Sequence, residues 1–162
     1  MATPTPAVSN FNRLFDSNYQ LQDDAAQITA SAAGTVAGSA KVVDLVPGTT
    51  SGDPAGVISG DLVIDVNTID ATTGDELYRI KLQLSASSTF ASGIVDSGAQ
   101  IELGGATSKT GGETGTDTVG RYIIRFWNVR KGTSYRYARI YFLLTGTTPI
   151  LDAEAYLSLK GP

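Results

Sequence analysis

Acidic residues gather between positions 61 and 76, at Asp61, Asp65, Asp70, Asp75 and Glu76. Carboxylate and carbonyl oxygens are the ligands that a hard cation such as Ca²⁺ prefers. However, the segment DVNTIDATTGDE does not have the spacing of a known calcium loop, and aspartate is common in turns because its side chain bonds nearby backbone groups. Glycoside hydrolysis needs two carboxylates held a fixed distance apart in a cleft, and no spacing in the chain favours such a pair. We therefore interpret these acids as turn and surface residues and expect no metal site.

Other catalytic chemistry has few candidates, because the sequence contains no histidine and no cysteine. Histidine is the commonest general base and metal ligand, and cysteine supplies thiol nucleophiles and zinc-binding thiolates. The segment GGATSKT has the lysine and threonine of a phosphate-binding loop, but it lacks the second glycine before lysine and no strand-to-helix context follows. We expect the chain not to be an enzyme and to need no cofactor.

Charge is distributed unevenly along the 162 residues, whose net charge is −4. Residues 1–76 hold ten acids and two bases, whereas residues 77–162 hold ten bases and six acids. Arginine alternates with aromatic residues in RYIIRFWNVRKGTSYRYARIYF, as on some nucleic-acid-binding surfaces. In a strand these aromatics alternate into the core, and the acidic remainder repels a phosphate backbone. We therefore expect no direct contact with nucleic acid. We expect a surface with both positive and negative charges that binds copies of the chain or a charged protein lattice.

One tryptophan offers a different kind of binding. Trp127 lies near Tyr135 and Tyr137 in the sequence, and together these rings could form a platform on which a sugar stacks. A single tryptophan near the end of a strand more often packs partly against its own domain. This platform is the main sequence argument for a carbohydrate-binding module.

The elements that position these candidate residues are predicted to be strands, because apolar residues recur at every second position in several segments. These segments are DLVIDVNT, LYRIKLQLS, RYIIRFWNV, YRYARIYFLLT and AEAYLSLK, with shorter candidates in QITASA, AKVVDLV, GIVDSG and QIELG. Turn signals such as TTGDE, RKGTS and TGTTPILD separate them, which is typical of an antiparallel β-sandwich or barrel with very little helix. The predicted core includes Leu62, Ile64, Ile80, Leu82, Leu84, Ile124, Ile140, Phe142 and Leu157.

The chain divides into an N-terminal arm, residues 1–27, and one sandwich domain, residues 28–162, with a long flexible loop at 104–120 that is rich in glycine and threonine. In the arm, Phe11, Leu14 and Phe15 have helical spacing in a short segment that covers its own domain or reaches a neighbouring subunit. No apolar run approaches the roughly 20 residues that span a bilayer, and MATPTPAVSN lacks the features of a signal peptide. We expect no membrane contact and no export.

Several of these segments resemble the capsid cement, or decoration, proteins of certain tailed bacteriophages. The resemblance runs through RIKLQLSASSTFASGIVDSGAQIELG and RYARIYFLLTGTTPILDAEAYLSLKG, with QITASAAG and AKVVDLV before them. The family has, in this order, an L-x-L-x-x-S strand, a TF-x-S segment, a short strand, an R-Y-x-R-I/L-x-Y strand and a G-T turn before a final x-A-x-L strand. The resemblance covers about residues 27–104 and 134–161, and the extension at 1–10 and the loop at 104–120 are longer than expected for the family.

The resemblance implies a jelly-roll-like sandwich with an extended arm, located on the outer surface of the virion capsid after synthesis in the host cytoplasm. Its partners would be the major capsid protein, whose subunits it fastens together, and copies of itself in a dimer or trimer. We expect hydroxyl groups of SASSTFASG to satisfy local backbone groups while Phe90 enters the core or a neighbour, and we expect GIVDSG and QIELG to lend an edge for strand addition. The residues expected to contact the capsid or another subunit are Phe11, Leu14, Phe15, Tyr19, Phe90, Arg136 and Arg139, with the charges of Arg136 and Arg139 protruding from the surface. The alternative is a carbohydrate-binding or fibre-type structural module.

Overall fold

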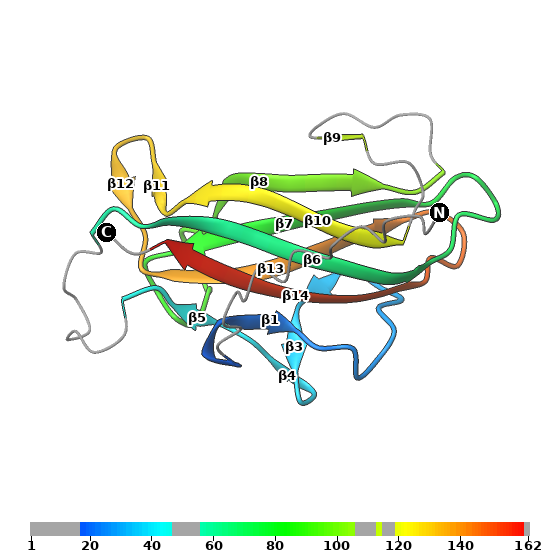
Figure 1. Ribbon diagram of the computed structural model, residues 1–162, viewed down its shortest axis with the longest axis horizontal. Helices are drawn as coiled ribbons and strands as arrows, with labels where there is room; N and C mark the ends of the chain where they lie inside the picture. Colours follow the sequence, from blue (N-terminus) through cyan, green and yellow to red (C-terminus); the bar gives the residue numbers. More distant parts are fainter. Residues whose placement is uncertain (1–16, 47–55, 106–112, 115–118, 161–162) are drawn as a thin grey trace, which may run out of the picture.

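A computed structural model of the chain describes residues 17–46, 56–105, 113–114 and 119–160. Two β-sheets face each other (Figure 1). The first sheet has the order β1 (Gln20–Gln22), β14 (Leu151–Lys160), β6 (Ser59–Ile69) and β10 (Gly120–Trp127). The second sheet has the order β2 (Ala32–Ala33), β13 (Tyr137–Thr145), β7 (Leu77–Ser85), β8 (Val95–Leu103) and β9 (Glu113–Thr114), and β5 (Val43–Asp44) also pairs with β13.

Smaller elements complete the described chain. Two hairpins stand beside the main sheets, one made of β3 (Thr35–Val36) and β4 (Ser39–Ala40), the other of β11 (Val129–Arg130) and β12 (Thr133–Ser134). The only helical turn in the described residues is the 3₁₀ helix η1 (Ser17–Tyr19).

The strand order is that of a jelly roll, in which the chain moves repeatedly between the two sheets. From β6 in the first sheet the chain enters β7 and β8 of the second, returns through β10, and then adds β13 and β14 to the two sheets in turn. All pairs of long strands are antiparallel. The predicted all-β, antiparallel, jelly-roll-like sandwich is therefore confirmed.

The alternation of apolar and polar residues directs the strands into the core. Along β13, Ala138, Ile140, Phe142 and Leu144 are buried, while the residues between them are only half-buried. These four residues stand opposite Leu84, Leu82, Ile80 and Tyr78 of β7, so the inward rows of the two strands coincide. A shift of the register by one residue would turn every one of these side chains outward.

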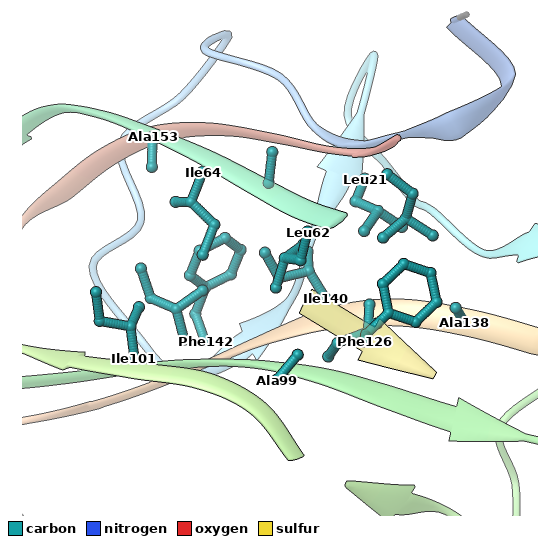
Figure 2. Close-up of a cluster of buried hydrophobic side chains, with 14 of the residues drawn as sticks. Leu21, Leu62, Ile64, Ala99, Ile101, Phe126, Ala138, Ile140, Phe142 and Ala153 are labelled. Atoms are coloured by element: carbon teal, nitrogen blue, oxygen red, sulfur yellow. The ribbon is translucent and has the colours of Figure 1, made fainter. Parts of the chain in front are cut away.

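The core fills the space between the sheets (Figure 2). Ile64 and Ala153 of the first sheet point towards Ile101 and Phe142 of the second in this view. Eight of the nine predicted core residues are buried; the exception, Ile124, is half-buried and packs against the core cluster. Ile124 lies on β10 at the edge of its sheet, where only β6 flanks it on the described chain.

The observed strands differ from the predicted ones in three places. Residues 20–22, placed in the arm by the sequence, form β1 and bury Leu21 completely. GIVDSG and QIELG are joined in the single strand β8, because Gly98, at a φ of 90°, lets the chain continue along β7. Within the predicted loop 104–120, residues 113–114 form β9, which pairs in parallel with β8.

Candidate functional site

Three of the expected contact residues come from two distant segments that meet on the second sheet. Phe90 follows β7. Arg136 immediately precedes β13 and Arg139 lies near its start, and β13 pairs with β7 along its length. Phe11, Leu14 and Phe15 lie outside the described residues. We call the outward side chains Lys81, Gln83, Tyr137, Arg139 and Tyr141, together with Phe90, the outer face of the second sheet.

Phe90 is held by a turn whose hydroxyl groups bond the backbone, as the sequence predicted. The Ser85 hydroxyl accepts a hydrogen bond from the Ser87 amide at 3.0 Å, and the Ser87 hydroxyl accepts one from the Thr89 amide at 3.3 Å. Phe90 then adopts a φ of 51°, a left-handed conformation that is unusual for a bulky residue. Its side chain is only 5% exposed, yet it does not belong to the core cluster between the sheets.

Arg139 covers Phe90 from β13. Its guanidinium carbon lies 4.5 Å from the centre of the Phe90 ring and 5.6 Å from that of Tyr141, distances at which a cation and an aromatic face attract each other. Its Nε donates a hydrogen bond of 2.9 Å to Oε1 of Gln83. Burial lowers the pKa of Arg139 from its ordinary value, but an arginine remains charged at neutral pH. The guanidinium is therefore held in one orientation by its neighbours, and the residue as a whole is half-buried.

Arg136 does not protrude, contrary to expectation. Its side chain is 9% exposed and forms a two-pronged ion pair with Asp44, in which Nη2 lies 2.7 Å from Oδ2 and Nε lies 3.0 Å from Oδ1. The cause is the pairing of β5 with β13, which places Asp44 beside the start of β13. The hydrogen bonds from Arg136 hold the pKa of the Asp44 carboxyl below its usual value. Arg136 is thus a structural residue of the second sheet.

Tyr19 lies apart from these residues. It ends η1, which contacts β14 in the first sheet, and its half-buried side chain packs against the core cluster. The structure therefore does not bring Tyr19 together with Phe90 and Arg139.

The acids at positions 70–76 accept hydrogen bonds within a turn between β6 and β7. Asp70 accepts a hydrogen bond from the Thr72 amide at 2.9 Å, and Glu76 accepts one from the Gly74 amide at 3.0 Å. Side-chain hydrogen bonds from threonine are the main cause that lowers the pKa of Asp70, Asp75 and Glu76. Among the described residues, no three acids are grouped so that they could hold a metal ion.

Part of the uneven charge along the sequence is balanced by ion pairs within the domain. Asp65 and Arg121 form a two-pronged ion pair with distances of 2.7 and 2.8 Å, and Asp61 lies 3.6 Å from Arg125. These pairs, like that of Asp44, join an acid from residues 1–76 to an arginine from residues 77–162. The antiparallel pairing of β6 with β10 creates two of them, because it aligns both aspartates with the arginines.

The aromatic platform expected around Trp127 is not assembled. Trp127 points outward from the first sheet and is 50% exposed, because its neighbour Phe126 enters the core. Tyr137 points outward from the second sheet, and Tyr135 packs against the core cluster. Trp127 is therefore exposed without these two partners.

Sequence reasoning missed three residues that organise this region: Asp44, Gln83 and Asn128. Asn128 is completely buried, donates hydrogen bonds to the carbonyls of Gly56 and Tyr135, and accepts one from the Ile58 amide at 2.7 Å. A single buried amide in a polar turn has no periodic signal. Gln83 could have been recognised, because it lies on the outward side of a strand that the period of two identified.

Comparison with known proteins gives no family assignment: no protein-family model matches the chain, and a search of curated proteins finds no match. The described residues contain no helix long and apolar enough to cross a membrane.

Proposed function

We propose that the chain is a structural virion protein that binds the outside of a tailed-phage head and stabilises contacts between major capsid protein subunits. The starting point is the resemblance of its strand segments to phage cement proteins. The jelly-roll order of the strands is the fold that this resemblance implied.

The contact between Phe90 and Arg139 carries the proposal. Phe90 belongs to the TFAS segment and Arg139 to the RYARIY segment, two of the stretches on which the resemblance rests. The fold places the Arg139 guanidinium over the Phe90 ring at 4.5 Å. Two segments of the resemblance therefore meet on one surface, the outer face of the second sheet.

This surface has the chemistry of a protein-binding site. Arginine and tyrosine are enriched in protein interfaces, and Arg139, Tyr137 and Tyr141 stand together on one side of β13. Because Gln83 and the two rings already orient Arg139, less side-chain entropy is lost when a partner binds. The expected partner group is a carboxylate of the major capsid protein, which a guanidinium binds with two parallel hydrogen bonds. Weak individual contacts suffice, because many copies engage a repeating shell.

The test is binding to heads of the phage that encodes the chain, prepared without it. The purified protein should sediment with these heads and raise the temperature at which they release DNA. Arg139→Glu should weaken binding by at least about tenfold, as expected for a central interface arginine. Lys131→Glu, at the exposed tip of the β11–β12 hairpin, is a matched control and should bind normally.

Failure of the folded wild-type protein to sediment with heads would refute the proposed function. Normal binding by Arg139→Glu, with an unchanged circular dichroism spectrum, would instead show that the capsid contact lies elsewhere on the molecule.

A carbohydrate-binding or fibre-type module is the second candidate, and the 50% exposed side chain of Trp127 favours it. Stacking of a sugar ring on Trp127 would require glycan binding that Trp127→Ala abolishes. A glycan array probed with both proteins separates this candidate from the first.

A further inference from the structure

The strand β10 forms one edge of the first sheet, and β1 forms the other (Figure 1). β1 has three residues, whereas β10 has eight and runs along β6 without a shift of register. Among the described residues, only β6 pairs with β10. Sheet edges are usually protected by short strands, bulges, proline or lysine, and β10, with the sequence GRYIIRFW, has none of these. We call the side of β10 away from β6 the β10 edge.

Alternate residues of β10 direct their backbone groups to this edge. The Asn128 amide, directly after the strand, donates a hydrogen bond of 3.0 Å to the Ile58 carbonyl, which continues the register of β10 with β6. Successive residues of a strand direct their N–H and C=O groups to opposite sides. The even-numbered residues of β10 therefore bond β6, and the odd-numbered residues face the β10 edge, namely Arg121, Ile123, Arg125 and Trp127.

The side chains along the edge leave apolar surface uncovered on both faces of the sheet. On the outward face, Ile123 is 53% exposed and Trp127 is 50% exposed, and the side chains of Arg121 and Arg125 are more than half exposed. On the inward face, Ile124 packs against the core cluster but is only half-buried. A strand added at the β10 edge would cover both faces.

A second copy of β10 fits this edge when a two-fold axis passes through Ile124. In this antiparallel register Ile124 stands opposite its own copy, and Arg121 stands opposite Trp127 of the second copy. A guanidinium and an indole ring attract each other at such positions. A register centred on Ile123 would instead place Arg121 opposite Arg125, and like charges directly opposite each other are destabilising. The sequence of the strand therefore favours the register centred on Ile124.

The two arginines carry balanced charge at the edge. Arg121 forms its ion pair with Asp65 at 2.7 Å, and Asp61 lies 3.6 Å from Arg125. Both aspartates lie on β6, opposite their arginines in the register, and therefore on the side away from the β10 edge. Two copies can meet at this edge without bringing together unbalanced positive charges.

We propose that the β10 edge binds the same edge of a second copy of the chain, with the two β10 strands antiparallel around a two-fold axis through Ile124. The first sheets of both copies then form one continuous sheet. Each Ile124 is covered by its own copy, and each Trp127 by Arg121 of the other chain. The contact uses no residue of the outer face of the second sheet, and it does not depend on the proposed function. Of the dimer and trimer that the resemblance implies, this pairing forms the dimer.

Disulfide formation between copies tests the pairing, because the natural sequence has no cysteine. Ile124 would face its copy in a pair without mutual hydrogen bonds, where the Cα atoms are about 4.5 Å apart, a separation that a disulfide spans. Under mild oxidation at micromolar concentration, Ile124→Cys should form covalent dimers at least about tenfold faster than Lys131→Cys at the exposed tip of the β11–β12 hairpin. Ile123→Cys, which is more exposed but does not face its own copy, is the matched control and should also be slower. Covalent dimers of Ile124→Cys that form no faster than those of both controls would overturn the proposal.

A proline at the β10 edge provides a second measurement. Because Ile123 directs its N–H away from β6, Ile123→Pro removes a hydrogen bond from the contact between copies, and proline is tolerated at such edge positions. The variant should keep the circular dichroism spectrum of the wild type but have the mass of one chain, 16.9 kDa, under conditions in which light scattering gives twice that mass for the wild type. Ile123→Ala keeps the N–H and should remain largely dimeric. A folded Ile123→Pro variant with the dimer mass, or a wild type that is monomeric at high micromolar concentration, would contradict the pairing.

Discussion

Arg136 and Arg139 are only three residues apart, yet they play different parts in the structure. Arg136 is buried and forms an ion pair with Asp44, whereas Arg139 stacks over Phe90 and is only half-buried. The difference arises because β5 pairs with the first residues of β13 and supplies a carboxylate there. Of the two arginines, only Arg139 is suited to meet a partner.

The pair of Asp44 and Arg136 should make stability depend on acid pH. Because the folded-state pKa of Asp44 is lowered, its contribution is present above the unfolded pKa of about 3.9 and is lost as the pH falls through the folded pKa. Asp44→Asn should therefore be less stable than wild type at neutral pH, and the difference should shrink below about pH 4. Urea unfolding of both proteins between pH 7 and pH 2.5 measures it, and the lowered pKa values of Asp70, Asp75 and Glu76 are common to both. A difference that stays constant with pH would contradict this role.

The stability of a Phe142 variant tests whether the inward side chains of β13 pack in the core as described. It is completely buried, so Phe142→Ala removes buried surface and leaves a cavity; the expected loss in the free energy of unfolding is about 3–5 kcal/mol. Val57→Ala, at a residue 78% exposed, should change it by less than about 0.5 kcal/mol. Chemical denaturation compares them, and a loss below about 1 kcal/mol for Phe142→Ala would mean that the packing of this row is misassigned.

At the scale of elements, Gly34, which joins β2 to β3, allows the chain to pass closely over β13. A Cβ at this position would contact the Leu21 carbonyl oxygen and the Ile140 side chain, and the Gly34 amide donates a 3.0 Å hydrogen bond to the Ile140 carbonyl. Gly34→Ala should therefore destabilise the fold by about 1–3 kcal/mol through overpacking. Gly56→Ala, where a Cβ would have open space, is the control and should lose little or no stability. Equal melting temperatures for the two variants would argue against the close approach.

The elements show which features of this fold a sequence can predict. Period two identified β6, β7, β10, β13 and β14, because each is long and turns a row of alternate apolar side chains towards the core. The short strands β1, β2 and β5 have two or three residues and depend on β13 and β14 for their partners, so local patterns carry little information about them. The same limit applies to the candidate site. Alternation along the strand predicted that Arg139 faces outward. The ion pair of Asp44 with Arg136 could not be predicted in this way, because it depends on a pairing between distant segments.

At the scale of the whole molecule, we predict a symmetric dimer or trimer. A single sandwich presents a small contact area, and clamping several lattice subunits at once requires more than one copy of the contact surface. Light scattering coupled to gel filtration should give a mass of two or three times 16.9 kDa at micromolar concentration. A monomer at high micromolar concentration would contradict the prediction.

The strands at the centres of both sheets are the last ones described along the chain. β14 stands between β1 and β6, and β13 stands between β2 and β7. During synthesis, neither sheet can therefore form all of its strand pairs until residues 137–160 have been made. Folding dominated by such distant pairings is slow, and strands that wait for partners can pair wrongly with other chains. The yield of folded protein should thus depend on how quickly these last strands follow the others out of the ribosome.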